Sequence, residues 1–283
     1  MIELDFPACV ERAFPREYPI ARRAAERVLR AIEGRDLSAL ARHSPGLRGY
    51  DWANYLRLSV IRQVRALAAL AAAGCLAGRV LDCGSYFGNF TLMLSEAGHA
   101  VEAVDSYDGY GEALAGIKAQ MASSGIRVRD FREVGHDLGG LPQARFDAVL
   151  CMGVIEHVPH TPRPLLEGVD RVLKPGGLLI LDTPNLAYLY NRQRLARGES
   201  IFCPIVSQYH TELPFEGHHR EFTIDEVGWM LAELGHEGIE VETFCYSIYA
   251  LPSLSGRDEE NFRAMEEDPT CRELILAASR KPR

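Results

Sequence analysis

The stretch that decides the fold is Val80-Leu81-Asp82-Cys83-Gly84-Ser85-Tyr86-Phe87-Gly88-Asn89-Phe90-Thr91. It starts as an apolar strand that ends in an acid, passes through a turn of small residues and continues into a helix. Such a turn lets the backbone approach a ligand, and the N-terminus of the helix faces that ligand. The stretch therefore predicts a cofactor site at the carboxyl end of a strand.

From Arg79 onward, short apolar or β-branched runs alternate with helical stretches, which is the pattern of a parallel sheet covered by helices. The expected strands are residues 79–83, 100–104, 126–132, 146–151 and 177–182, followed by two closing strands at about 238–249 and 272–279. Between the fourth and fifth strands, Thr161-Pro162 and Lys174-Pro175-Gly176-Gly177 are the start and stop signals of a helix. We predict an α/β fold with a doubly wound, mostly parallel, seven-stranded sheet.

Residues 1–76 form the expected N-terminal helical extension. Its Ala-rich segments at 15–33 and 51–73 carry apolar residues at helical spacing, with a break at Ser44-Pro45-Gly46. Residues 77–283 form the expected cofactor-binding domain.

The forty-residue stretch 183–222, after the fifth strand, is too long for an ordinary connection. We expect it to be a lid or acceptor-binding loop. It leads into Thr223-Ile224-Asp225-Glu226, a capping box that predicts a helix over 223–235, with Phe222 and Val227 placed to staple its start.

Composition excludes several classes of protein. Apolar residues are 47% and charged residues 25% of the 283, which fits neither a disordered nor a fibrous chain. The seven cysteines are scattered without a C-x-x-C pair, so we expect reduced thiols rather than a zinc or redox site. The uncharged run 66–78 is too short to span a bilayer, and the first five residues are acidic where a secretory signal is basic. We therefore expect a cytoplasmic protein with no membrane partner.

Charge is unevenly distributed. The net charge is −8, but residues 1–76 carry +4 and the remaining residues −12. An acidic body repels a phosphate backbone, so nucleic acid is not an expected partner. The sequence leaves the oligomeric state open, a homodimer included.

Further motifs follow the glycine turn. Asp105 ends the next strand, 23 residues after Asp82, where a carboxylate can accept both hydroxyls of a ribose. Nicotinamide enzymes and methyl-donor enzymes share this pair of features. Three more segments come in order: His136-Asp137-Leu138, then Phe146–Cys151 with Glu156-His157-Val158, then Leu173-Lys174-Pro175-Gly176-Gly177-Leu178. In this combination the sequence resembles the class I S-adenosylmethionine-dependent methyltransferases, over about residues 79–250, and in particular the branch acting on small molecules and sugars.

The resemblance implies a Rossmann-like sheet and a donor site. It places Asp82, Gly84 and Gly88 at the methionine end of S-adenosylmethionine and Asp105 at the ribose. It places Asp137 at the adenine amino group, with Leu138 and Cys151 flanking the ring. Ser85, Tyr86, Asn89 and Ser106 complete the expected cofactor-binding set. Tyr86 departs from the family, which most often has a glycine there, and we expect its side chain to restrict the turn and cover the methionine portion.

Methyl transfer to a hydroxyl needs a base, and imidazole titrates near neutrality. The candidates are His219, His218 and His157, with His219 placed first; a structural role explains His157 equally well. The resemblance includes relatives that bind a metal here while methylating quinol precursors, but Gly153 stands where a further acid would be needed. We therefore expect no required metal.

The expected acceptor is a small molecule, most simply a hydroxyl of a sugar or natural-product-type metabolite. Arg57, Tyr188, Arg192 and Tyr209 are the candidate acceptor-binding residues. Arginine has a planar fork suited to phosphate or carboxylate, so a phosphorylated or nucleotide-linked acceptor is one alternative. Methylation of nitrogen or carbon is another, and a catalytically silent donor-binding subunit is a third. A nicotinamide oxidoreductase is disfavoured because the turn does not complete G-x-G-x-x-G.

Overall fold

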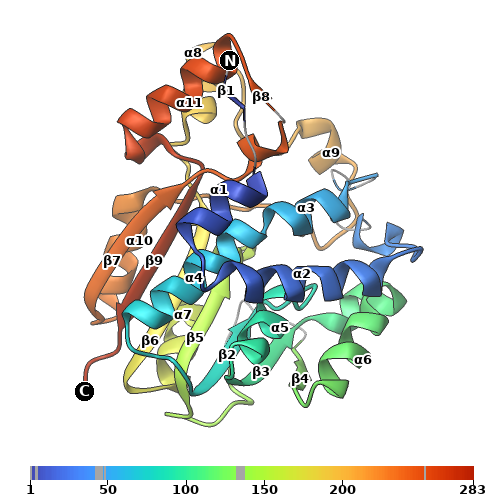
Figure 1. Cartoon of the computed structure of the whole chain (residues 1–283), viewed down its shortest axis with the longest axis vertical. Helices are drawn as coiled ribbons and strands as arrows, with labels where there is room; N and C mark the ends of the chain where they lie inside the picture. Colours follow the sequence, from blue (N-terminus) through green and yellow to red (C-terminus); the bar gives the residue numbers. More distant parts are fainter. Residues whose placement is uncertain (1, 4–5, 42–46, 48, 132–137, 252) are drawn as a thin grey trace.

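The computed structural model describes residues 2–3, 6–41, 47, 49–131, 138–251 and 253–283 (Figure 1). The main sheet contains β2 (Arg79–Cys83), β3 (Ala100–Asp105), β4 (Arg127–Asp130), β5 (Phe146–Met152), β6 (Leu173–Pro184), β7 (Glu237–Phe244) and β9 (Leu274–Arg280). The α-helices are α1 (Phe6–Ala13), α2 (Tyr18–Ile32), α3 (Trp52–Leu58), α4 (Val60–Ala72), α5 (Asn89–Glu96), α6 (Ala115–Ser123), α7 (Arg163–Val172), α8 (Leu189–Ala196), α9 (Ile205–Tyr209), α10 (Ile224–Glu233) and α11 (Arg257–Glu267). The short 3₁₀ segments are η1 (Ser38–Ala41), η3 (Tyr107–Leu114), η4 (Ile155–His157), η5 (Ser247–Ala250) and η6 (Pro269–Cys271). The break expected at Ser44-Pro45-Gly46 lies outside the described residues.

The seven-stranded sheet has the order β4-β3-β2-β5-β6-β9-β7. The first five strands in this order pair in parallel, and β9 runs antiparallel to both β6 and β7. The chain proceeds outward from β2 to β4 and then returns to place β5 on the other side of β2. In open α/β sheets, ligands bind outside the carboxyl ends of the strands at such a switch point. The expected fold class is confirmed, and the glycine turn lies at the switch.

Each strand alternates between two apolar layers. On one face Val80, Ala148 and Ile180 belong to a cluster with the apolar residues of α2, α4 and α5. On the other face Leu81 and Val149 belong to a cluster with α7 and α10. Figure 1 shows the extension helices in front of the sheet and α10 behind it. The sheet is therefore buried on both sides, as its apolar strands require.

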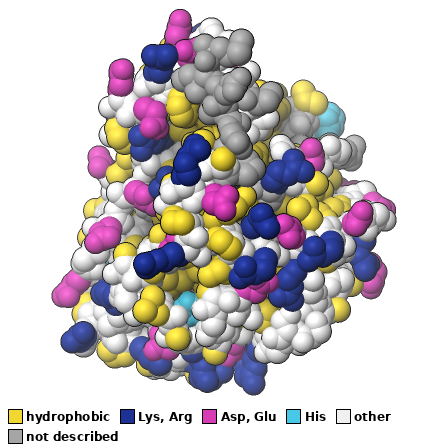
Figure 2. Space-filling model, in the orientation of Figure 1, with side chains coloured by type: hydrophobic (Ala, Val, Ile, Leu, Met, Phe, Trp, Pro, Cys, Tyr) yellow, Lys and Arg dark blue, Asp and Glu magenta, His cyan; other side chains and the backbone are white. Residues whose placement is uncertain are grey.

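The helical segment expected over 51–73 is two helices, α3 and α4. They meet at Ser59, whose hydroxyl donates to the carbonyl of Tyr55 at 2.8 Å. Local bonds of this kind compete with the helical ladder and bend it. The extension is tied to the body by charge as well, because Arg23 and Arg27 of α2 both pair with Glu96 of α5 at 3.2 Å. Figure 2 shows Lys and Arg side chains gathered across the middle of the face that α2 crosses.

The stretch 183–222 leaves the end of β6 and returns beside it. An isolated bridge joins Asn185 to Phe222, and the amide of Leu186 donates to the Phe222 carbonyl at 2.9 Å. The stretch contains α8 and α9, so it is partly helical. Figure 1 shows α8 and α11 together at one end of the molecule, near the two-stranded pair of β1 (Ile2–Glu3) and β8 (Ser253–Leu254). Neither α11 nor this pair was expected from the sequence.

None of the helices in the described part of the chain combines the length and the apolar character that a bilayer span requires.

The capping box at α10 forms as expected. The Thr223 side chain accepts from the Glu226 amide at 3.3 Å, and the Glu226 carboxylate accepts from the Thr223 amide at 2.9 Å. Phe222 and Val227 are both buried in the cluster behind the sheet, which fits the expected staple. The box closes the stretch 183–222 onto a rigid helix.

We expect Thr223→Ala to lower the free energy of unfolding by about 1 kcal/mol, because the first turn of α10 loses its side-chain cap. Urea denaturation monitored by circular dichroism measures this change. Glu233→Ala, at the exposed far end of the same helix, is the matched control. Equal effects of the two substitutions would contradict the capping assignment.

Candidate functional site

Two glycines of the turn are required by its geometry. Gly84 has φ +80° and Gly88 has φ +68°, a region that side chains rarely adopt. A Cβ at position 84 would lie 2.3 Å from Cγ2 of Val154, and one at 88 would lie 2.6 Å from Sδ of Met121. α5 begins directly after Gly88 without a side-chain cap, so its first amides are available to an anionic group.

Tyr86 occupies the middle of the turn with φ +41°. Its amide donates to Oδ2 of Asp105 at 2.6 Å, which ties the turn to the end of β3. Its ring packs edge-on against Phe87, Tyr110 and Trp52, with centroids 4.5, 5.2 and 5.9 Å away. Trp52 comes from α3, so an aromatic cluster joins the extension to the donor turn. Sequence reasoning missed Trp52, which has no motif of its own.

Asp105 is nearly buried where β3 ends. Its Oδ1 accepts from the Ser106 amide at 2.7 Å and from the Tyr110 hydroxyl at 3.2 Å. Burial raises the pKa of Asp105, and these hydrogen bonds offset the rise only in part. A buried carboxylate gains from further donors, and the two hydroxyls of a ribose are such donors. The residue therefore fits the expected role.

Other expected donor residues brace the turn. The Asp82 side chain accepts from the Thr91 hydroxyl in α5, and burial raises the pKa of Asp82 to about 7. Ser85 shares a hydrogen bond of 2.7 Å with the Tyr107 hydroxyl. The carbonyl of Asn89 accepts from the Gln63 side chain of α4 at 2.8 Å. These contacts hold β2, α5 and α4 in one arrangement.

The expected adenine pocket is apolar. Leu138 and Cys151 are fully buried in the cluster behind the sheet. Contact with Cys83 and burial raise the pKa of Cys151, so its thiol stays neutral. Asp137 lies outside the described residues, and its assignment to the adenine amino group stays a prediction.

Three separate parts of the chain enclose a cavity of about 290 Å³. Its walls come from the extension, the turn after β5 and the stretch 183–222: Leu47, His157, Ile201, Phe202, Cys203, Phe215, Glu216, Gly217, His218 and Glu221. Two of the three candidate bases, His157 and His218, therefore face one cavity.

The three histidines have different partners. His218 Nδ1 lies 2.9 Å from Oε1 of Glu221, and its ring meets that of His157 edge-on at 4.8 Å. Burial lowers the pKa of His218, but the bond to Glu221 and the charge of Glu156 more than offset this, so the net shift is upward. The His157 side chain is exposed to solvent, but the protein atoms around its ring and the neighbouring His218 lower its pKa to about 4. His219 Nε2 lies 3.0 Å from the carbonyl of Phe215, with its ring beside the Phe215 ring.

One group of side chains in the described part of the chain could hold a metal ion. Ligand atoms of Glu156, His157 and His218 all lie within 4.8 Å of one another. Burial raises the pKa of Glu156 to about 7. The expectation that no metal is required stays a prediction.

The expected acceptor-binding residues lie elsewhere in the structure. Arg57 is exposed on α3, and Tyr209 is 79% exposed on α9. Tyr188 packs beside the small cluster of Cys245 and Met265. The cavity lining, taken over the described residues, includes none of Arg57, Tyr188, Arg192 and Tyr209.

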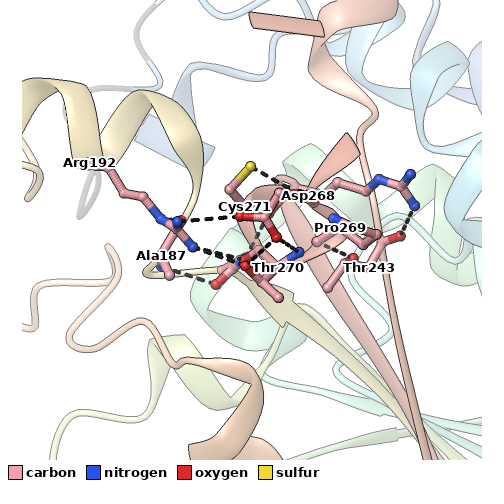
Figure 3. Close-up of polar contacts among 9 residues, drawn as sticks. Ala187, Arg192, Thr243, Asp268, Pro269, Thr270 and Cys271 are labelled. Atoms are coloured by element: carbon pink, nitrogen blue, oxygen red, sulfur yellow. Dashed lines mark hydrogen bonds and ion pairs between the residues drawn. The ribbon is translucent and has the colours of Figure 1, made fainter. Parts of the chain in front are cut away.

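Arg192 has structural partners. Its side chain donates to the carbonyl of Ala187 at 2.6 Å and to Thr270 at 3.3 Å. Figure 3 draws these contacts as dashed lines. It also pairs with Asp268 at 3.7 Å. These contacts tie α8 to η6, so an acceptor contact by Arg192 stays a prediction.

The chain belongs to the family described as "Methyltransferase domain", whose model matches residues 52–241. The match begins in α3, earlier than the expected resemblance at residue 79. The protein is an S-adenosylmethionine-dependent methyltransferase. Its sequence is 29% identical over 198 residues to the ubiquinone biosynthesis O-methyltransferase of Xanthomonas axonopodis pv. citri, covering 68% of this chain and 76% of that protein.

Two solved structures share the fold. Burkholderia thailandensis 1,6-didemethyltoxoflavin-N1-methyltransferase, with 1,6-didemethyltoxoflavin and S-adenosylhomocysteine bound, has a TM-score of 0.51 and 18% identity, covering 86% of this chain and 85% of that one. Haemonchus contortus phosphoethanolamine N-methyltransferase 2, in complex with S-adenosyl-L-methionine, has a TM-score of 0.52 and 16% identity, covering 77% of this chain and 52% of that one.

We expect Asp105→Ala to weaken S-adenosylmethionine binding at least about tenfold, because the amides that Asp105 accepts from are left unpaired and the ribose loses its acceptor. Calorimetry on the folded variant measures this. Asp130→Ala is the matched control, since Asp130 pairs in register with Asp105 on β4 but is exposed. Unchanged affinity in Asp105→Ala would show that the ribose binds elsewhere.

Proposed function

We propose that this methyltransferase transfers a methyl group to a hydroxyl oxygen of a small, largely apolar acceptor, with His218 as the general base. The acceptor would bind in the cavity of about 290 Å³ described above. The observation that carries the proposal is the contact between His218 and Glu221 in the wall of that cavity. The O-methyltransferase named above supports the choice of oxygen.

The contact with a carboxylate and the place in the cavity wall support the choice of His218. Glu221 fixes the Nδ1 proton of His218, so a neutral ring keeps its Nε2 lone pair for the acceptor hydroxyl. His219, the first candidate from the sequence, donates Nε2–H to the Phe215 carbonyl and is not among the cavity residues. His157 donates to the Glu216 carbonyl at 2.9 Å, and its lowered pKa makes it a weak base.

The protein's task in this reaction is alignment and proton removal. The bound donor supplies a methyl group on a positively charged sulfur, and the sulfur keeps the electron pair of the carbon–sulfur bond that breaks. The cavity walls orient the acceptor hydroxyl. As the oxygen forms its bond to carbon, its proton passes to Nε2 of His218. Glu221 and Glu156 then stabilise the imidazolium.

The cavity lining favours a neutral acceptor. Leu47, Ile201, Phe202 and Phe215 give apolar walls suited to a ring, and the acidic side chains come from Glu216 and Glu221. Acidic walls repel a phosphate or carboxylate. A phosphorylated or nucleotide-linked acceptor is the alternative, and it would make the acceptor KM depend on salt.

We also propose that the extension, residues 1–76, and the stretch 183–222 close the acceptor side over the domain 77–283. Leu47 of the extension and residues 201–203 and 215–218 of the stretch line the same cavity. Outside the cavity lining, the stretch exposes further apolar side chains at Ile205, Val206, Tyr209 and Leu213.

Replacing the base tests the reaction. We expect His218→Gln to lower kcat about 10²- to 10⁴-fold with donor affinity unchanged, because loss of a general base acts on the transition state. Steady-state kinetics with a phenolic acceptor, and calorimetry with the donor, measure the two quantities.

His219→Gln is the control and should keep most of its kcat. The kcat of the wild type should rise with pH as His218 loses its proton, and Glu221→Gln should move that rise to lower pH because the bond that raises the pKa is lost. The groups facing His218 here are Glu221, Glu156 and His157. Full activity in His218→Gln would remove His218 from the mechanism.

The cavity wall tests the acceptor. We expect Phe202→Ala to raise the acceptor KM roughly tenfold, equal to about 1.4 kcal/mol of lost apolar contact, with no dependence on salt. Ile205→Ala, exposed on the same stretch, is the control. An anionic acceptor predicts instead that Arg57→Ala raises KM and that salt brings the wild type toward the variant.

A further inference from the structure

One arginine of the extension reaches the end of the sheet. Arg62 of α4 is 7% exposed, and its Nε and Nη2 atoms each lie 2.7 Å from a carboxylate oxygen of Asp182, which is fully buried in β6. Nη1 donates to the Tyr55 hydroxyl at 3.3 Å, and the guanidinium lies over the Phe90 ring, 5.5 Å from its centroid. The pair holds α3, α4, α5 and β6 together.

The guanidinium also fills a space left by a glycine. Gly153 follows β5 with φ +68°, and a Cβ there would lie 2.9 Å from Nη2 of Arg62 and 3.5 Å from Oε1 of Glu156. The Gly153 amide donates to the carbonyl of Asp182 at 3.0 Å. Arg62 and the turn after β5 are therefore fitted to each other.

That turn is bonded to the segment that carries the proposed base. The Glu156 side chain accepts from the Thr183 hydroxyl at 3.1 Å, next to Asp182. The Glu156 carbonyl accepts from the His219 amide at 2.8 Å, one residue after His218. A continuous set of contacts thus leads from Arg62 through Asp182 and Glu156 to His218.

We propose that Arg62 is a positioning residue for methyl transfer: its pairing with Asp182, at the space left by Gly153, fixes the turn after β5 and through it the place of His218. The proposal rests on the proposed role of His218. Arginine suits the position because its planar fork meets both carboxylate oxygens while a third nitrogen reaches Tyr55.

A purely structural role makes a different prediction. Removing Arg62 alone strands a buried carboxylate and destabilises the protein, whatever the function of the pair. Replacing both partners with apolar residues of similar volume removes that penalty. The double variant Arg62→Met with Asp182→Leu therefore separates stability from positioning.

The experiment compares Arg62→Met, the double variant and Arg65→Met by thermal melting, donor calorimetry and steady-state kinetics. Arg65→Met removes the same charge three residues along α4, where Arg65 pairs with Glu242 at 2.8 Å near the surface. We expect Arg62→Met to melt at lower temperature and the double variant to melt near the wild type. We expect the double variant to keep donor affinity but lose at least tenfold in kcat, and Arg65→Met to keep kcat within twofold.

A double variant that recovers both melting temperature and kcat overturns the proposal, because the pair is then only structural. Loss of donor affinity in the double variant overturns it as well, because Arg62 then acts on the donor site.

Should the double variant fail to fold, the Gly153→Ala variant serves instead, because the added methyl group displaces Nη2 of Arg62 without removing a charge. We expect this variant to have a lower kcat with donor affinity kept. Unchanged kcat in folded Gly153→Ala overturns the proposal. The His218→Gln variant tests the proposed base separately from the positioning role of Arg62. Full activity of that variant would refute the role of His218, whatever result the Arg62 variants give.

Discussion

The buried ion pair of Arg62 and Asp182 is the constraint that fixes the N-terminal extension on the sheet. Burying two charges costs several kcal/mol each, and only good geometry with further hydrogen bonds compensates. The two contacts of 2.7 Å and the bond to Tyr55 meet that condition. Arg62 and Asp182 lie 120 residues apart in the chain, so their contacts form only when α4 packs on the sheet in the position seen here. The ion pair therefore joins the extension to the main sheet at the carboxyl end of β6.

The aromatic contact at Tyr86 has a similar effect on the donor side. A tyrosine with φ +41° is strained by itself and persists because neighbours hold it. Trp52 packs on it from the extension, and Asp105 accepts its amide from the sheet. The family match that starts at residue 52 includes these helices. The helices of the extension therefore support the glycine turn through Trp52 and the end of β6 through Arg62.

Local sequence signals accounted for the parts of the structure that local chemistry determines. The strand that carries Asp82, the glycine turn that follows it and the capping box at Thr223 all follow from residues close in sequence. The fold class followed from their order.

Long-range contacts were not accessible in the same way. Arg62 is one arginine among many, and only its meeting with Asp182 and Gly153 distinguishes it. His218 and His219 are adjacent, and the sequence alone placed His219 first. Our proposal favours His218 because of its contact with Glu221, which depends on the turn of the loop and has no signal in the sequence. Helix α11 was missed because its sequence is polar on most sides and it packs on a small separate cluster.

The two ends of the stretch 183–222 are anchored to each other, and this lets the segment between them vary in sequence without change to the rest of the fold. Asn185 bonds to Phe222 through the bridge and also donates its side chain to the carbonyls of Thr270 and Arg272, at 2.9 and 2.7 Å. A loop whose two ends are anchored together can change length or sequence at little cost to the sheet. Eight of the ten residues that line the cavity, His218 and Glu221 among them, lie inside this loop. An exchange of this one segment would carry the proposed base and the acceptor surface with it as a unit, and leave the methyl-donor machinery in place for a new substrate.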